Sequence, residues 1–394
     1  MNRRLRAIRP AILALVLLTI GNRLSVGQSA PGVTDKMIVI GSCSALEGPS
    51  HALGTQQIKG AQAYFELIND EGGIAGRKLK LVAFDDSYDP AKTETCFKRL
   101  QSQNVFALGF FVGTPTAVKY LPMAEEAKIP VVGLFTGAQT LYTPRHWVIN
   151  VRASYATETR EQVEGLWNKL GYRKIGVIYP DDAFGAAVLE GVTVALKAKG
   201  AEPIALGSYP RQTADAEQAI RGVRAANPEA VVIVGPANTV GPILQKAHAQ
   251  GWKPLFLTVS FVGTDDLILH AGADAEGMVV TQVVPPYYMT DLKTVAMYRK
   301  TLAKYFPGEQ PGFVSLEGFV NAMVMVEGLK RAGKDLTREG LVRGIEAIHQ
   351  FDLGLGPQLK LDYSARDHAG FDTVIPTVIR GGRAVPFTDW SNVR

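Results

Sequence analysis

Two turns rich in glycine and threonine carry the side chains best suited to binding chemistry. They are residues 113–116 (Gly-Thr-Pro-Thr) and residues 136–138 (Thr-Gly-Ala), and each follows a short apolar run. Hydroxyl groups and free backbone N–H groups beside a helix start suit a carboxylate or another anionic oxygen. A single turn of this kind is more often only a helix N-cap. Two of them at strand ends in one half of the chain favour a ligand site.

Aromatic and acidic side chains in the second half of the chain are further candidates. Phe184 stands in the first turn of an expected helix, where it would add little to a core, so a ligand contact and a lobe surface are both open. Ser260 and Phe261 follow an apolar run at an equivalent place. Asp266 and Glu317 could balance a cationic ligand, but we expect both to be solvated helix positions.

Motifs for catalysis, phosphate binding and metal binding are absent from the sequence. There is no GxxxxGK[ST], HExxH or GxSxG, the six histidines are scattered, and the glycines of residues 109–113 have the wrong spacing for a dinucleotide fingerprint. We therefore expect no catalytic residue, no metal site and no cofactor. An exported hydrolase on a flavodoxin-like scaffold is the enzymatic alternative, although no nucleophile and base can be nominated for it.

The elements that would position these residues follow a regular alternation of strand-like apolar runs and amphipathic, helix-like segments. The runs of the first half are residues 37–41, 78–84, 105–109 and 129–134. The alternation restarts in the second half, with runs at residues 174–179, 203–207, 230–235 and 255–259. Near-continuous apolar strands in this order predict an α/β fold with parallel sheets flanked by helices, and the restart predicts two Rossmann-like lobes. The apolar segments 146–151 and 278–284 predict ordered connections between the lobes.

Length and charge bound the class of protein. The 394 residues suit two domains, and 46% hydrophobic with 20% charged residues is a globular composition. The first 30 positions hold five arginines and no acidic residue, so the 42 basic residues of the whole chain fall to 37 beyond them, which equals the number of acidic residues. The remaining chain therefore lacks the excess positive charge that nucleic-acid binding requires, and we expect no nucleic-acid partner.

The N-terminal segment has the pattern of a secretory signal. A basic start precedes the apolar run from Ala11 to Ile20, and small residues follow between positions 25 and 30. Ten helical residues reach only about 15 Å, half of a bilayer core of about 30 Å, so a stable membrane span is not expected. We expect residues 1–30 to be a cleaved signal peptide and the mature chain to lie outside the cytoplasm. An uncleaved interfacial anchor is the alternative.

Export from the cytoplasm would allow the two cysteines to form a disulfide. In an oxidising compartment Cys43 and Cys96 are candidates for a disulfide, and two buried free thiols are the alternative. Neither a CxxC pair nor a Cys/His spacing typical of a metal site occurs. We favour the disulfide.

An ordered series of segments resembles a known family. The strings GSCSALEGPSHALG at residues 41–54 and INDEGGIAGRKL at residues 68–79 resemble type I periplasmic solute-binding proteins of the Leu/Ile/Val-binding family, the soluble receptors of ABC importers. The resemblance continues through residues 59–62, 85–90, 179–185 and 277–285. It therefore covers essentially the whole mature chain.

The resemblance implies two lobes joined by a three-strand hinge, with the ligand enclosed between them. The first lobe would hold residues 34–150 and 282–357, and the second would hold residues 151–281 and 358–394. The protein would be a monomeric, non-enzymatic receptor that delivers a small-molecule ligand to an ABC permease in the inner membrane. A sensory protein that docks on a membrane kinase or chemoreceptor is the alternative.

The resemblance also implies the residues that contact the ligand. Gly113 and Thr114 would take a ligand carboxylate, and Phe184 stands where the family often has a tyrosine over the ligand. The full set of candidate ligand-binding residues is Leu53, Gly113, Thr114, Phe135, Thr136, Gly137, Tyr155, Phe184, Ser260 and Phe261.

The sequence departs from the family pattern at the ligand's ammonium group. Ser260 stands where the Leu/Ile/Val binders have a glutamate that pairs with this group, and Ala237 replaces a binding tyrosine. An enclosed ammonium without a carboxylate partner costs several kcal/mol. Beside an amino acid, we therefore expect an aliphatic or aromatic acid, an amide or a urea-like solute as the ligand. Tyr88 and Val112 occupy the positions of the family's usual disulfide, so the bond expected above would be a different one.

Overall fold

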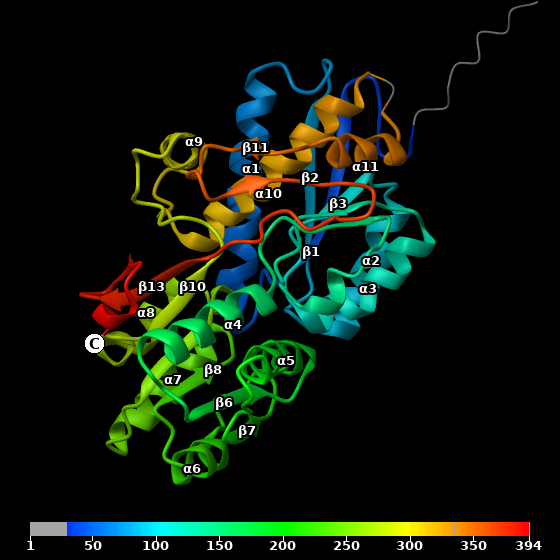
Figure 1. The fold of residues 1–394 in the computed structure, drawn as a ribbon. Coiled ribbons are helices and arrows are strands. Elements are labelled where there is room, and N and C mark those ends of the chain that lie inside the picture. The colour runs from blue at the N-terminus through cyan, green and yellow to red at the C-terminus, as the bar shows by residue number, and fades with distance from the viewer. Residues whose placement is uncertain (1–29, 335, 394) are drawn as a thin grey trace, which may run out of the picture.

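The computed structural model describes residues 30–334 and 336–393, which form two lobes (Figure 1). The first lobe is built on a five-stranded parallel sheet in the order β2-β1-β3-β4-β5. Its strands are β1 (Met37–Ser44), β2 (Lys78–Asp85), β3 (Ala107–Gly109), β4 (Val131–Val132) and β5 (Val148–Ile149). The helices that connect the first four strands are α1 (His51–Asp70), α2 (Pro90–Ser102) and α3 (Thr114–Glu126).

The second lobe is built on a seven-stranded sheet in the order β14-β13-β10-β9-β8-β6-β7, in which β13 and β14 are antiparallel to their neighbours. Its strands are β6 (Ile175–Pro180), β7 (Ala205–Tyr209), β8 (Ala230–Ile233), β9 (Leu255–Val259), β10 (Val279–Gln282), β13 (Ile375–Arg380) and β14 (Arg383–Pro386). Its helices are α4 (Tyr155–Glu164), α5 (Ala183–Lys197), α6 (Glu217–Ala225), α7 (Ala237–Ala249) and α8 (Thr264–Ala271). Every residue of β8 and β9 is buried, as expected for parallel strands covered on both faces.

The fold class predicted from the alternation is confirmed, but some strand bounds differ. The apolar run 129–134 forms only the two-residue strand β4. Pro130 has no N–H to donate to a neighbouring strand, and Gly133 adopts a left-handed φ of 71° that ends the strand. Apolar composition alone does not reveal either limit.

Three connections between the lobes occur in the described part of the chain. They are residues 150–154 between β5 and α4, residues 283–292 after β10, and residues 362–374 before β13. The first and third lie side by side, because the N–H of Phe371 donates to the carbonyl of Val151 at 2.8 Å. Two of the three connections between the lobes are therefore hydrogen-bonded to each other.

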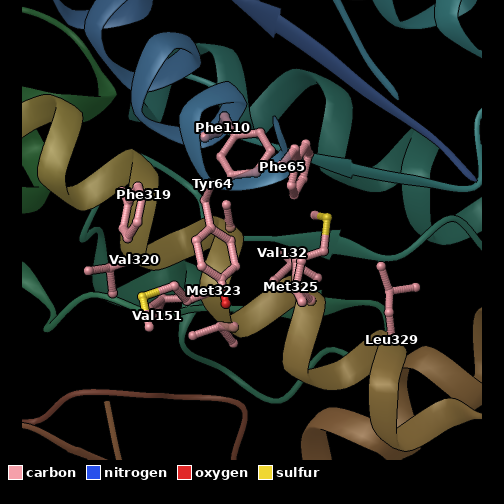
Figure 2. Close-up of a cluster of buried hydrophobic side chains, with 14 of the residues drawn as sticks. Tyr64, Phe65, Phe110, Val132, Val151, Phe319, Val320, Met323, Met325 and Leu329 are labelled. Carbon is pink, nitrogen blue, oxygen red and sulfur yellow. The ribbon is translucent and has the colours of Figure 1, made fainter. Parts of the chain in front are cut away.

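The last helices of the chain return to the first lobe. They are α9 (Lys293–Tyr305), α10 (Phe313–Ala332) and α11 (Arg338–Glu346), and α9 and α10 both pack on α1. Figure 2 shows Tyr64 of α1 among side chains of α10, and its ring centroid is 4.9 Å from that of Phe319. A Cβ at Gly60 would lie 1.8 Å from the carbonyl oxygen of Ser315. The glycine therefore lets the two helix backbones touch and fixes the position of α10.

Both cysteines of the chain take part in one disulfide. Cys43 in β1 and Cys96 in α2 are bonded, with their Cα atoms 6.0 Å apart. Both residues are buried in the core of the first lobe. The bond therefore fastens α2 to β1, the strand that pairs with β3.

Candidate functional site

The two threonine-containing turns lie side by side at the carboxyl ends of β3 and β4. The hydroxyl oxygens of Thr114 and Thr136 are 2.7 Å apart, and both residues are buried. The N–H of Gly113 donates to the carbonyl of Phe135 at 3.0 Å. Two hydroxyl groups therefore lie together at the N-terminus of α3, where free backbone N–H groups favour an anionic oxygen.

Gly113 is the N-cap residue of α3 and adopts a left-handed φ of 93°. A Cβ at this position would lie only 2.0 Å from the ring of Tyr88. Since both the backbone conformation and the available space exclude a side chain, only glycine fits. The turn therefore packs directly against the ring of Tyr88.

Phe261 packs against aromatic rings of both lobes. Its ring centroid lies 5.2 Å from that of Phe135 and 5.9 Å from that of Tyr88, both in the first lobe. It also lies 4.4 Å from that of Phe184 in the second lobe, which in turn lies 5.4 Å from that of Tyr155. All five rings are buried. The lobes are thus closed over an aromatic cluster made by both of them.

The N-terminal ends of α5 and α4 position the rings of Phe184 and Tyr155. The carboxylate of Asp182 caps α5 by accepting the N–H groups of Phe184 and Gly185 at 2.9 and 3.0 Å. The side chain of Phe184 is buried and packs against the rings of Tyr155 and Phe261. The N–H of Tyr155 at the start of α4 donates to the carbonyl of Gly137 at 2.6 Å, which joins α4 to the second threonine turn.

Contacts connect all ten candidate residues into one region. Leu53 in the first turn of α1 is buried, and a Cβ at Gly263 would lie 2.8 Å from its Cδ2. Gly263 follows Phe261 by two residues, so Leu53 closes the region on the side of α1. The structure therefore brings the predicted residues together.

Arg152 is a central residue that the sequence analysis missed. It lies on the first connection between the lobes and is 1% exposed. Its guanidinium carbon is 5.1 Å from the ring centroid of Phe135 and 5.6 Å from that of Tyr155, and one of its nitrogens, Nη2, donates to the hydroxyl of Ser260. The sequence holds one signal for this role, which is that Arg152 directly follows the apolar segment 146–151. An arginine in a buried segment needs a partner for its charge.

Glu158 lies on the other side of Arg152 and is well supplied with donors. Its Oε2 accepts the N–H of Ser260 at 2.7 Å and the hydroxyl of Thr281 at 2.8 Å. Its Oε1 accepts the hydroxyl of Ser260 at 2.9 Å and lies 3.3 Å from Nη2 of Arg152. The family's glutamate is therefore absent at position 260, but a carboxylate from α4 contacts that same residue.

Glu317 is buried, which corrects the expectation of a solvated helix position. The N-terminal end of α10 is covered by the second lobe, because the N–H of Phe313 donates to a carboxylate oxygen of Asp265 at 2.9 Å. Glu317 Oε1 lies 3.4 Å from Nη1 of Arg152. Burial raises the pKa of Glu317 to about 7, against the attraction of Arg152, which lowers it. Asp266 is partly exposed and pairs with His270 at 3.6 Å, outside this group.

Comparisons with known proteins agree with this architecture. A family model for periplasmic binding proteins matches residues 37–382. The chain is 27% identical over 296 residues to an amino acid binding protein of Pseudomonas aeruginosa, covering 74% of this chain and 77% of that protein. It is 22% identical over 248 residues to the Leu/Ile/Val-binding protein of Escherichia coli, covering 63% and 67% of the two chains. A crystal structure of a possible leucine/isoleucine/valine-binding protein from Rhodopirellula baltica SH 1 has a TM-score of 0.87 and 31% identity, covering 93% of this chain and 99% of that one.

Two α/β lobes that meet over a buried polar and aromatic site define a type I binding-protein fold. The chain belongs to the periplasmic binding protein family, and its similarity is to the Leu/Ile/Val-binding group within it. The resemblance drawn from the sequence segments is thereby confirmed. Among the described residues, no group of three or more histidine, cysteine, aspartate and glutamate side chains could hold a metal ion.

Proposed function

We propose that this protein is the periplasmic receptor of an ABC importer. It encloses a small organic ligand, which is an amino acid, a carboxylic acid or an amide, and delivers it to a membrane permease. The observation that carries the proposal is the buried Thr114–Thr136 hydroxyl pair at the start of α3, next to the aromatic residues through which the lobes meet. The names of its relatives in Pseudomonas aeruginosa and Rhodopirellula baltica support an amino acid among these ligands.

The mechanism follows from the position of the site between two lobes. A ligand that touches residues of both lobes makes all its contacts only in the closed form, so it favours closure by its differential affinity for the two forms. The permease then recognises the closed form. The protein forms no covalent bond to the ligand, and the ligand leaves unchanged.

The bounds of the two lobes support a ligand site formed by both of them. We assign residues 34–150 and 282–361 to the first lobe, and residues 151–281 and 362–394 to the second. The expected bound at residue 357 moves to 361, because β12 (Lys360–Leu361) pairs with β11 (Phe351–Asp352) of the first lobe. The strands β1 to β5 fall in the first assignment, and β6 to β9 with β13 and β14 fall in the second. The ligand-binding residues then come from both lobes, as closure requires.

The periplasm is the proposed location, in agreement with the family. We propose that residues 1–30 are a cleaved secretory signal, and residues 1–29 of that segment lie outside the described part of the chain. In residues 30–334 and 336–393, no helix combines the length and the apolar composition of a membrane span. The disulfide between Cys43 and Cys96 suits an oxidising compartment.

Replacing Thr114 by alanine is expected to weaken ligand binding by about 1–3 kcal/mol, because the ligand oxygen and the Thr136 hydroxyl would each lose a buried partner. The ligand is first found by a thermal-shift screen of amino acids, carboxylic acids and amides. Its affinity for each variant is then measured by titration calorimetry.

Thr143→Ala is the matched control, since Thr143 is exposed and its hydroxyl donates to the carbonyl of Thr140 and not to the hydroxyl pair. It should bind the ligand as the unmodified protein does. If Thr114→Ala and Thr136→Ala also bind with unchanged affinity, these turns are not part of the ligand site.

A further inference from the structure

The guanidinium of Arg152 is only partly used by the protein's own groups. Its Nη2 contacts the hydroxyl of Ser260 and the carboxylate of Glu158. Its Nε and Nη1 have no hydrogen-bond partner among the described residues, although the side chain is buried and Nη1 lies 3.4 Å from the carboxylate of Glu317. Buried donors in folded proteins are nearly always paired, so Nε and Nη1 of Arg152 can still donate to an acceptor from outside the chain.

These donors lie inside the candidate site. Phe135 and Tyr155, whose rings are the nearest to the guanidinium, both belong to the predicted ligand-binding set. Phe135 directly precedes Thr136 of the hydroxyl pair. An acid whose carboxylate binds at the hydroxyl pair could therefore place a second oxygen against Arg152.

Two buried carboxylates, those of Glu158 and Glu317, already face the guanidinium of Arg152. A ligand cation would have to compete with Arg152 for both of them. The carboxylate of Glu158 accepts four hydrogen bonds from the protein, one of them from Arg152 itself. The carboxylate next to Ser260 is therefore already paired with a cation of the chain. A ligand ammonium at this place would meet the positive charge of Arg152 and would displace it from Glu158 only at a large cost.

The walls beside Arg152 are apolar and flat. Phe135, Tyr155, Phe184 and Phe261 contribute rings that contact one another within 5.4 Å of centroid separation. Such walls favour an apolar, planar ligand body. Arginine is also better suited than lysine to a planar oxygen acceptor, because its N–H groups form a fixed fork.

We propose that Arg152 takes the place of the ligand's ammonium group, so that the site selects an apolar carboxylate that has no ammonium and offers a second oxygen acceptor. An apolar 2-oxo acid has this chemistry, with its carboxylate at the Thr114–Thr136 pair and its 2-oxo oxygen accepting from Nε and Nη1 of Arg152. This assignment rests on the proposed function, since it concerns the ligand of the same site.

The test compares matched acids that differ only at the α-carbon substituent. Titration calorimetry of the unmodified protein uses phenylpyruvate against phenylalanine, and 4-methyl-2-oxopentanoate against leucine. We expect each 2-oxo acid to bind at least tenfold more tightly than its amino acid. Equal or tighter binding of the amino acids overturns the assignment of Arg152 and leaves the receptor function standing. If neither pair binds but another solute does, the ligand class is likewise wrong, whereas the absence of any binding solute contradicts the receptor function itself.

Arg152→Lys tests the residue rather than the ligand class. Lysine keeps the positive charge but has no counterpart of Nε and Nη1. We therefore expect at least a tenfold loss of affinity for phenylpyruvate and a smaller ratio of the phenylpyruvate affinity to the phenylalanine affinity. Arg221→Lys on the exposed face of α6 is the control and should change neither affinity. An unchanged ratio in a folded Arg152→Lys variant overturns the role of Arg152. The comparison of the matched acids on the unmodified protein decides the ligand class even if the variant does not fold.

Discussion

Alanine in place of Phe261 is expected to lower the free energy of unfolding by about 3–5 kcal/mol, the usual loss for a fully buried phenylalanine. The ring contacts Tyr88 and Phe135 of one lobe and Phe184 of the other. Its removal therefore leaves a cavity at the place where the lobes meet, and closure cannot fill it without moving one lobe relative to the other. Chemical denaturation followed by circular dichroism measures the change.

Leu269→Ala is the control for this variant. Leu269 is a large apolar residue of α8, close in sequence to Phe261, but it is 81% exposed. Its replacement should change the free energy of unfolding by no more than about 0.5 kcal/mol. Equal effects of Phe261→Ala and Leu269→Ala would show that the ring of Phe261 does not hold the lobes together.

Loss of the disulfide is expected to lower the free energy of unfolding by about 4 kcal/mol. Cys43 and Cys96 are 53 residues apart, and a cross-link over a loop of that length restricts the unfolded chain by about this amount in the chain-entropy model. The double variant Cys43→Ala/Cys96→Ala is the proper test, because a single replacement would leave a reactive thiol. Both variant and unmodified protein are unfolded in denaturant with and without a reducing agent.

Reductant supplies the internal control for the disulfide. It should destabilise the unmodified protein to about the level of the double variant and leave the double variant unaffected. If the unmodified protein unfolds at the same denaturant concentration with and without reductant, the bond does not stabilise the first lobe.

Much of the fold and part of the site could be predicted because local patterns determine them. Parallel strands buried on both faces leave continuous apolar runs in the sequence, so the α/β lobes followed from the alternation. The hydroxyl pair followed from a similar rule, since turns after neighbouring parallel strands meet at one edge of a sheet. Both rules need only the order of residues within a few turns of chain.

The charged centre of the site could not be predicted in this way. Arg152 contacts Ser260 across 108 residues of sequence, and Glu317 approaches it from α10 of the other lobe. A buried charge is stable only beside its partners, and those partners come together only after both lobes have formed. The sequence therefore predicts a solvated Glu317, because its own helix gives no sign that the second lobe covers it.

The most direct test of ligand enclosure is to recover the ligand from its complex. The protein is saturated with the ligand found in the thermal-shift screen, freed of excess by rapid gel filtration and denatured, and the released small molecule is identified and counted by mass spectrometry. We expect close to one equivalent of chemically unchanged ligand per chain, and at a ligand concentration of 100 times the Kd a stabilisation of about 2.7 kcal/mol. Recovery of an altered molecule, or of none at all from a stabilised protein, would contradict a receptor that closes on a solute and releases it intact.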